Sequence, residues 1–133
     1  MAERVYCLYR GKDQESILMQ KNACHDFAEK KGWNIVGEEQ EIGVSGYKVS
    51  TDDLVKLKRI RKAAEQGEFD ILLVFMYDRL GRNLNETPFI AKWFTKKGIH
   101  VWSVYEGEII DGVDAERMLD YIRSWQTDEA QKL

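Results

Sequence analysis

Proline, cysteine and long apolar runs are scarce in this sequence. One proline, Pro88, and two cysteines, Cys7 and Cys24, occur among 133 residues. The cysteines lack the spacing of metal ligands, so we expect structural thiols in a reducing cytoplasm rather than a disulfide framework. No stretch approaches the roughly 20 apolar residues of a membrane helix, and the first residues do not form a secretion signal. A membrane protein and a secreted, disulfide-rich protein are therefore not expected.

An excess of positive charge is also missing, because the formal net charge is -3 at pH 7. A domain that binds nucleic acid by itself usually carries a basic surplus, since its affinity comes largely from neutralising phosphates. If this chain acts on nucleic acid, another region has to supply most of the binding.

The chain does have 44% hydrophobic residues, which is enough for one compact domain with a core. Its strand-like and helix-like segments alternate, and this order predicts an α/β fold with a mostly parallel central sheet flanked by helices. Gly32 and Gly67 follow apolar-periodic segments and indicate helix ends. The expected strands cover residues 5–9, 33–38, 70–75 and 100–105, and the expected helices cover 16–31, 52–66, 87–97 and 114–133.

The strongest candidate for chemistry is the segment DRLGR, which follows the apolar strand 70–75. It places Asp78, Arg79 and Arg82 beyond the carboxyl end of a strand, where open α/β sheets bind ligands. Two guanidinium groups can hold a phosphate and neutralise charge that develops in phosphoryl transfer, and a carboxylate can exchange a proton with an attacking or leaving oxygen. A surface salt-bridge cluster is the alternative, since Arg82 and Glu86 are four residues apart.

Two further loops favour the functional interpretation. Arg10 follows the first strand and Ser45 lies in the loop after the second, so both are expected at the same edge of the sheet. Arginines, an acid and a hydroxyl from three separate loops are harder to explain as coincidence than one short motif is.

In order along the chain, the segments LYR, SILMQ, GVSG, DRLGR and VWSVYEGE resemble motifs of the catalytic domain of the serine recombinases, the resolvase and invertase family. The similarity covers almost the whole chain, and the ordered set is more specific than any single motif. The chain looks most like the domains of large serine integrases and transposon recombinases. A resolvase-like catalytic fold, ending in the start of a long interface helix, is what the resemblance implies.

The resemblance also implies an enzyme of DNA recombination and DNA integration. In that family a serine hydroxyl attacks a DNA phosphodiester, forms a 5′-phosphoserine link and releases a 3′ hydroxyl, with no metal or other cofactor required. Because the bond energy is retained in the phosphoserine, the strands exchange and rejoin without ATP.

Residues that match the family motifs acquire roles by the same resemblance. Arg10, Arg79 and Arg82 are expected to bind the scissile phosphate and to stabilise its transition state. Asp78 is expected to protonate the leaving oxygen or to position an arginine. The residues expected to support the site are Gln20 and Ser45.

The organisation of the chain follows from the resemblance as well. Residues 1–112 are expected to form the catalytic domain, and residues 113–133 to begin the long helix that makes homodimer and homotetramer contacts. A DNA-binding region is expected after Leu133 in the complete protein. The expected partner is DNA, with no membrane, and the expected setting is the cytoplasm, with a bacterial or mobile-element origin.

One position departs from the family pattern. The nucleophilic serine should stand two residues after Arg10, but Lys12 occupies that place, and an ammonium group cannot replace the hydroxyl. Ser16 is the nearest hydroxyl, and we expect it to cap the following helix rather than to act as the nucleophile. We expect that a loop carrying the serine is absent from this sequence. The alternative is an inactive recombinase-like domain with a regulatory or assembly role.

Two further interpretations remain open. The second helix carries a basic run of Lys56, Lys58, Arg59, Arg61 and Lys62. This run is expected to be a solvated face, with contact to DNA flanking the site as the alternative. A small phosphate-binding or nucleotide-binding protein is disfavoured, because the chain has no glycine-rich phosphate-binding loop.

Overall fold

The structure, a computed structural model, describes residues 3–42, 51–80 and 87–109, with the backbone alone at residues 51–56, 78, 87–88 and 109. Strands and helices alternate along the chain, as the hydrophobic pattern predicts. The strands are β1 (Arg4–Gly11), β2 (Asn34–Ile42), β3 (Ile71–Val74), β4 (His100–Ser103) and β5 (Gly107–Ile109), and the helices are α1 (Gln14–Lys31), α2 (Thr51–Glu65), the short 3-10 helix η1 (Tyr77–Arg79) and α3 (Thr87–Lys96).

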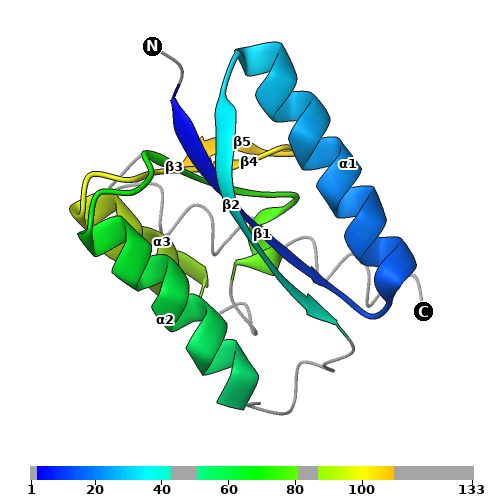
Figure 1. Cartoon of the computed structure of the whole chain (residues 1–133), viewed down its shortest axis with the longest axis horizontal. Helices are drawn as coiled ribbons and strands as arrows, with labels where there is room; N and C mark the ends of the chain where they lie inside the picture. Colours follow the sequence, from blue (N-terminus) through cyan, green and yellow to red (C-terminus); the bar gives the residue numbers. More distant parts are fainter. Residues whose placement is uncertain (1–2, 43–50, 81–86, 110–133) are drawn as a thin grey trace, which may run out of the picture.

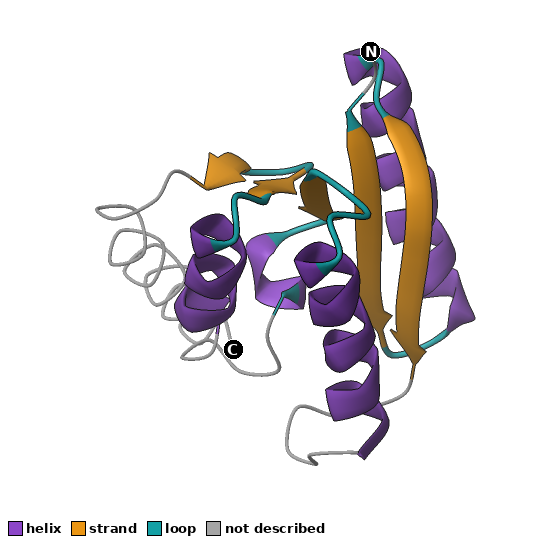
Figure 2. Ribbon diagram, turned by 60° about the vertical axis from the view of Figure 1, so that its left-hand side comes forward, coloured by secondary structure: helices purple, strands orange, loops and turns teal. Residues whose placement is uncertain are grey.

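The strands form one sheet in the order β2-β1-β3-β4-β5. The pairs β1–β2, β1–β3 and β3–β4 are parallel, and β5 pairs antiparallel with β4. Helix α1 covers one face of the sheet, and α2 and α3 cover the other (Figures 1 and 2). The predicted α/β class with a mostly parallel sheet is therefore confirmed.

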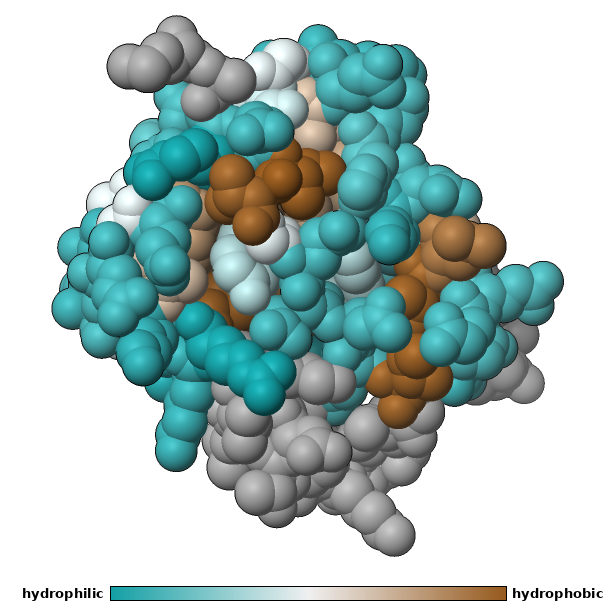
Figure 3. Space-filling model, viewed as in Figure 1, coloured by the Kyte–Doolittle hydropathy of each residue, from teal (hydrophilic) through white to brown (hydrophobic). Residues whose placement is uncertain are grey.

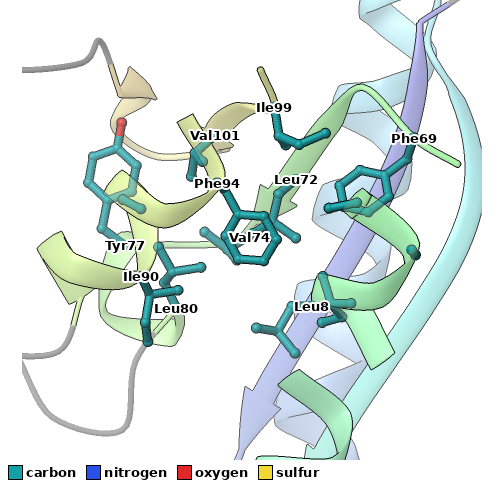
Figure 4. Packing of buried hydrophobic residues seen from close by; sticks show 14 residues of the cluster. Leu8, Phe69, Leu72, Val74, Tyr77, Leu80, Ile90, Phe94, Ile99 and Val101 are labelled. Atoms are coloured by element: carbon teal, nitrogen blue, oxygen red, sulfur yellow. The ribbon is translucent and has the colours of Figure 1, made fainter. Parts of the chain in front are cut away.

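Alternating side chains of β1 divide the core into two clusters. Tyr6 and Leu8 face α2 and α3, whereas Val5, Cys7 and Tyr9 face α1. Since both faces are covered, β3 consists entirely of buried apolar residues, as a central parallel strand should. Figure 4 shows the larger cluster, whose labelled members are Leu8, Phe69, Leu72, Val74, Tyr77, Leu80, Ile90, Phe94, Ile99 and Val101.

Helix α1 begins two residues earlier than the sequence pattern predicts. Its N-cap is Asp13, whose side chain accepts a hydrogen bond from the Ser16 amide at 2.8 Å. The expectation that Ser16 caps this helix is wrong, because the preceding aspartate reaches the free amide and places Ser16 inside the first turn. The helix ends as predicted at Gly32, which adopts the left-handed conformation with φ 74°.

Three features were not predicted. Strand β2 continues through an acidic stretch to Ile42, which is possible because an edge strand exposes one side to solvent. Strand β5 has three residues, and η1 is a single 3-10 turn, so neither contains enough residues to produce a periodic pattern. The predicted helix in residues 113–133 lies outside the described residues.

Of the helices in the described part of the chain, none has the length and apolar character needed to cross a membrane.

Candidate active site

The site lies at the carboxyl ends of β1 and β3, where the chain changes direction across the sheet. From β1 the chain passes through α1 to β2 on one side, and then returns through α2 to β3 on the other side. In open α/β sheets, ligands bind outside the strand ends at such a switch point. Arg10 and Gly11 end β1, and η1 follows β3 and contacts β1. The two segments therefore meet at this edge.

The backbone of Arg10 is held by the side chain of Gln20 from α1. The Arg10 amide donates to Gln20 Oε1 at 3.1 Å, and Gln20 Nε2 donates to the Arg10 carbonyl at 2.5 Å and to Ser16 Oγ at 3.3 Å. Gln20 has no solvent-exposed surface, so no water competes for these bonds. Gly11 permits this close approach, because a Cβ there would lie 2.6 Å from Ser16 Oγ. The start of α1 and the end of β1 thus form one rigid unit.

The side chain of Arg10 pairs with Glu41, which comes from the edge strand β2. The two residues are partners in the parallel register of β1 and β2, so their side chains leave the same face of the sheet. Arg10 Nε and Glu41 Oε2 lie 3.3 Å apart, and the two side chains are 14% and 6% exposed. A carboxylate so deeply buried fixes the guanidinium and partly neutralises it. Glu41 was not predicted as a site residue, although an acid on the strand beside Arg10 was the available signal.

The turn that carries Asp78 and Arg79 is fixed by the connection between β4 and β5. The Tyr77 amide donates to Glu106 Oε2 at 2.9 Å, and the Tyr77 hydroxyl donates to the Gly107 carbonyl at 2.5 Å. Glu106 is itself fixed, since its amide donates to the buried Ser103 Oγ at 2.7 Å. The ring of Tyr77 also packs in the apolar cluster of Figure 4. These contacts set the direction in which η1 leaves β3.

The structure therefore brings together part of the predicted set. Arg10 and Gln20 are in direct contact, and Arg79 lies half-buried in η1, which contacts β1. The predicted residues Ser45 and Arg82, together with the side chain of Asp78, lie outside what the structure describes.

Tyr9 belongs to the LYR segment but faces away from this site, toward α1. Its hydroxyl donates to Glu38 Oε2 at 2.6 Å, and His25 Nε2 lies 2.8 Å from the same oxygen. Burial raises the pKa of Tyr9 above its ordinary value, so its hydroxyl stays protonated. Burial also opposes ionisation of Glu38, but hydrogen bonds from His25 and Tyr9 outweigh it and lower the pKa of that carboxyl. This cluster is a structural contact between β1, β2 and α1.

The position where the motif would place a nucleophile is occupied by Lys12. It is exposed, and with Asp13 it makes up the whole connection between β1 and α1. Ser16 is the nearest hydroxyl in this part of the chain, and its Oγ already accepts from Gln20. Its contact with the buried carboxamide makes Ser16 part of the support of Arg10.

Two guanidinium groups on neighbouring segments are suited to an anion with several oxygens. The planar fork of an arginine matches a phosphate or a carboxylate, and its charge persists at all ordinary pH values. Glu41 and Gln20 fix Arg10, and the Tyr77 contacts fix the backbone turn that carries Arg79. A guanidinium fixed in this way can stabilise negative charge with little reorganisation. Among the described residues, no group of three or more histidines, cysteines, aspartates and glutamates has an arrangement that would hold a metal ion.

Comparisons with known proteins agree with this fold. The family described as Resolvase, N terminal domain, matches residues 10–132. The N-terminal catalytic domain of TP901-1 integrase is similar with a TM-score of 0.70 and 25% identity, over 97% of this chain and 98% of that chain. No curated protein matches in sequence.

Two further solved structures share the fold. A resolvase family site-specific recombinase from Streptococcus pneumoniae has a TM-score of 0.72 and 20% identity, over 97% of this chain and 91% of that chain. The C-terminal catalytic domain of ISC1926 TnpA, an IS607-like serine recombinase, has a TM-score of 0.65 and 22% identity, over 97% of this chain and 84% of that chain.

Proposed function

We propose that this chain cleaves and exchanges DNA strands through a 5′-phosphoserine intermediate. The chain belongs to the resolvase family and is a serine recombinase catalytic domain. The observation that carries the proposal is Arg10, fixed by Gln20 and Glu41 at the switch point of the sheet beside η1. A recombinase has to hold one phosphodiester still while a hydroxyl attacks it, and a rigid cationic site meets that requirement.

In the proposed reaction, a serine hydroxyl attacks the scissile phosphorus and the P–O3′ bond breaks. The serine hydroxyl loses its proton as its oxygen bonds to phosphorus, and the 3′ oxygen gains a proton as it leaves, so the number of protons is unchanged. Arg10 and Arg79 hold the non-bridging oxygens, where negative charge increases in the transition state. Asp78 protonates the leaving oxygen or positions an arginine. The roles proposed for the remaining residues are phosphate binding for Arg82 and support of the site for Gln20 and Ser45.

The attacking serine is proposed to belong to a segment after Arg10 that is absent from this sequence. The connection at Lys12 and Asp13 is exposed, and exposed connections accept additional residues more readily than buried ones do. Additional residues there would leave the buried contacts of Gln20 unchanged. Intact-mass measurement of the native protein tests this point, since a mass of 15.6 kDa would match the sequence as it stands and contradict the proposal.

One observation favours a second function, an inactive recombinase-like domain with a regulatory or assembly role. The two-residue connection is closed by a complete N-cap, in which Asp13 accepts from the Ser16 amide at 2.8 Å. A chain that needs no further residues to join β1 to α1 can have lost its nucleophile and kept its fold. Such a domain would bind its partners and cut nothing.

Trapping on DNA separates the two functions. A suicide duplex labelled at the 3′ end of the cleaved strand, and nicked so that cleavage cannot be reversed, should form a labelled covalent adduct with the native protein that survives denaturing electrophoresis. Arg79→Ala should abolish the adduct and leave DNA binding within about twofold, because the arginine acts on the transition state. Arg4→Ala, at the opposite end of β1, is the matched control and should still form the adduct. Absence of an adduct with the native protein would establish the inactive alternative.

Assembly and context are part of the same proposal. We assign the homodimer and homotetramer contacts to residues 113–133. The complete protein is proposed to contain a DNA-binding region as well. Its proposed location is the cytoplasm of a bacterium or of the host of a mobile element. Light scattering of a protein extended beyond Leu133 tests the assembly, and a strictly monomeric extended protein would contradict it.

A further inference from the structure

Helices α2 and α3 lie side by side on one face of the sheet and carry a concentrated positive charge (Figures 1 and 2). Helix α2 and residues 87–97, which are α3 and the residue after it, contain eight lysines and arginines and three acidic residues, a surplus of five positive charges. The whole chain has a net charge of -3, so the rest of the chain carries -8. The positive charge is therefore gathered on these two helices.

An aromatic contact joins the cations of the two helices. Arg61 Cζ lies 5.1 Å from the ring centroid of Trp93, and Lys97 Nζ lies 5.5 Å from the same centroid. Within the described ranges, the buried Nε of Arg61 has no hydrogen-bond partner. Arg59 forms an ion pair with Glu39 at 3.9 Å. Trp93 thus holds two cations together across the boundary between α2 and α3.

The remaining lysines of this surface are exposed, and intramolecular pairing does not account for them. In the parts of the chain that the structure describes, no carboxylate forms an ion pair with Lys58, Lys62, Lys92 or Lys96. The helix dipole favours cations in a last turn, where Lys62 and Lys96 lie. It does not explain Lys58 and Lys92, which lie further from the helix ends.

We propose that the surface formed by α2 and α3, with Arg61, Trp93 and Lys97 at its centre, binds the phosphate backbone of double-stranded DNA away from the cleavage site. The choice of DNA rests on the proposed function, whereas the positive surface does not depend on it. A duplex carries one negative charge per about 1.7 Å of its axis, and lysines four residues apart on a helix are about 6 Å apart along it. Several phosphates therefore face the surface at once. The surface over α2 in Figure 3 is mainly hydrophilic, as a backbone contact requires.

Binding of a labelled 30-base-pair duplex, followed by fluorescence anisotropy over a series of salt concentrations, tests the proposal. The double variant Lys92→Glu/Lys96→Glu should bind about tenfold more weakly at low salt, and the slope of log affinity against log salt should fall by about 2, because each lost phosphate contact removes about 0.9. The control Lys21→Glu/Lys30→Glu changes the charge equally on α1, on the opposite face of the sheet. It should bind within about twofold of the native chain, and circular dichroism confirms that both variants fold.

Three outcomes would overturn the inference. The first is that the native chain fails to bind the duplex, and the second is that both double variants lose affinity equally. The third is that a polyglutamate peptide binds the surface and the duplex does not. The last outcome would assign the surface to an acidic protein. Cleavage is measured separately with Arg79→Ala, which should lose the covalent adduct and keep this binding. A failure of cleavage therefore counts against the proposed function alone, and a failure of the anisotropy experiment counts against this surface alone.

Discussion

The carboxamide of Gln20 satisfies both backbone groups of Arg10, accepting from its amide at 3.1 Å and donating to its carbonyl at 2.5 Å. A backbone at the end of a strand normally needs another strand or water for these bonds. Here a fully buried side chain of α1 supplies them, and the residue that it fixes carries the guanidinium of the candidate site. Helix α1 therefore contributes to the geometry of the site without presenting a charged group to it.

Replacing Gln20 should destabilise the protein. Gln20→Leu leaves a buried amide and a buried carbonyl without partners, and we expect the free energy of unfolding to fall by about 2 kcal/mol or more. Urea denaturation measures the change. Gln14→Ala, at an exposed position at the start of the same helix, is the control and should change it by less than about 0.5 kcal/mol. Equal effects of the two substitutions would contradict the role of Gln20.

Glu41 should act on the proposed reaction through Arg10. Glu41→Gln removes the charge that fixes the guanidinium, and we expect the single-turnover rate of adduct formation to fall about tenfold. Glu41→Asp should recover part of the rate, since it restores the charge. Glu39→Gln is the matched control on the same strand, where Glu39 accepts from Tyr6 at 3.3 Å, and its rate should be unchanged. If Glu41→Gln lowers stability but not the rate, Glu41 is only structural.

The hydroxyl of Tyr77 should contribute to stability through the Gly107 carbonyl. Tyr77→Phe keeps the ring in the apolar cluster and removes the bond at 2.5 Å, so the free energy of unfolding should fall by about 1 kcal/mol. Tyr105→Phe removes a hydroxyl from a residue that is 70% exposed, and should have almost no effect. Thermal unfolding of both variants checks the difference, and a Tyr77→Phe protein as stable as its control would refute it.

Stability should depend on pH through Asp70. Its carboxylate accepts from the Arg4 amide at 3.0 Å, from Nε at 3.1 Å and from Nη2 at 3.0 Å, and these bonds lower the pKa of Asp70 below its ordinary value of 3.8. Because the pKa of Asp70 is lower in the folded state than in the unfolded state, its carboxylate stabilises the fold at pH values above the unfolded-state pKa. This contribution to stability is lost as the pH falls through the folded-state pKa.

Asp70→Asn should therefore be less stable than the native protein at pH 7, and the difference should narrow below about pH 4. The control is Asp26→Asn, which breaks a solvent-exposed pair with Lys30 and should change stability by less than about 0.5 kcal/mol. Urea titrations at a series of pH values give both curves. A difference for Asp70→Asn that stays constant down to pH 2 would show that the carboxylate charge is not involved.

The two cysteines should be unreactive in the folded protein. Both are free and completely buried, and a hydrogen bond with Cys7, together with burial, raises the pKa of the Cys24 thiol. Because the thiolate is the reactive form, a disulfide reagent should label the native protein more than about 100-fold more slowly than the protein in urea. A cysteine introduced by Asn22→Cys at an exposed position of α1 is the positive control. Rapid labelling of Cys24 without denaturant would contradict this prediction.

The sequence by itself determined the order and type of most elements, because these depend on local periodicity. The apolar run at residues 70–75 predicts a strand covered on both faces, and β3 forms within it at residues 71–74, all of which are buried. Strands that follow one another in a parallel sheet end at the same edge, so the position of Arg10 near the segment after β3 could also be predicted.

The tertiary structure alone decided which side chains fix that edge. Glu41 reaches Arg10 because β2 continues beside β1 in a particular register, and Tyr77 reaches Gly107 because β5 folds back onto β4. Trp93 gathers cations from two helices that are separate in the sequence. Such contacts depend on the pairing and packing of distant segments, and no local pattern of residues encodes the distance between them.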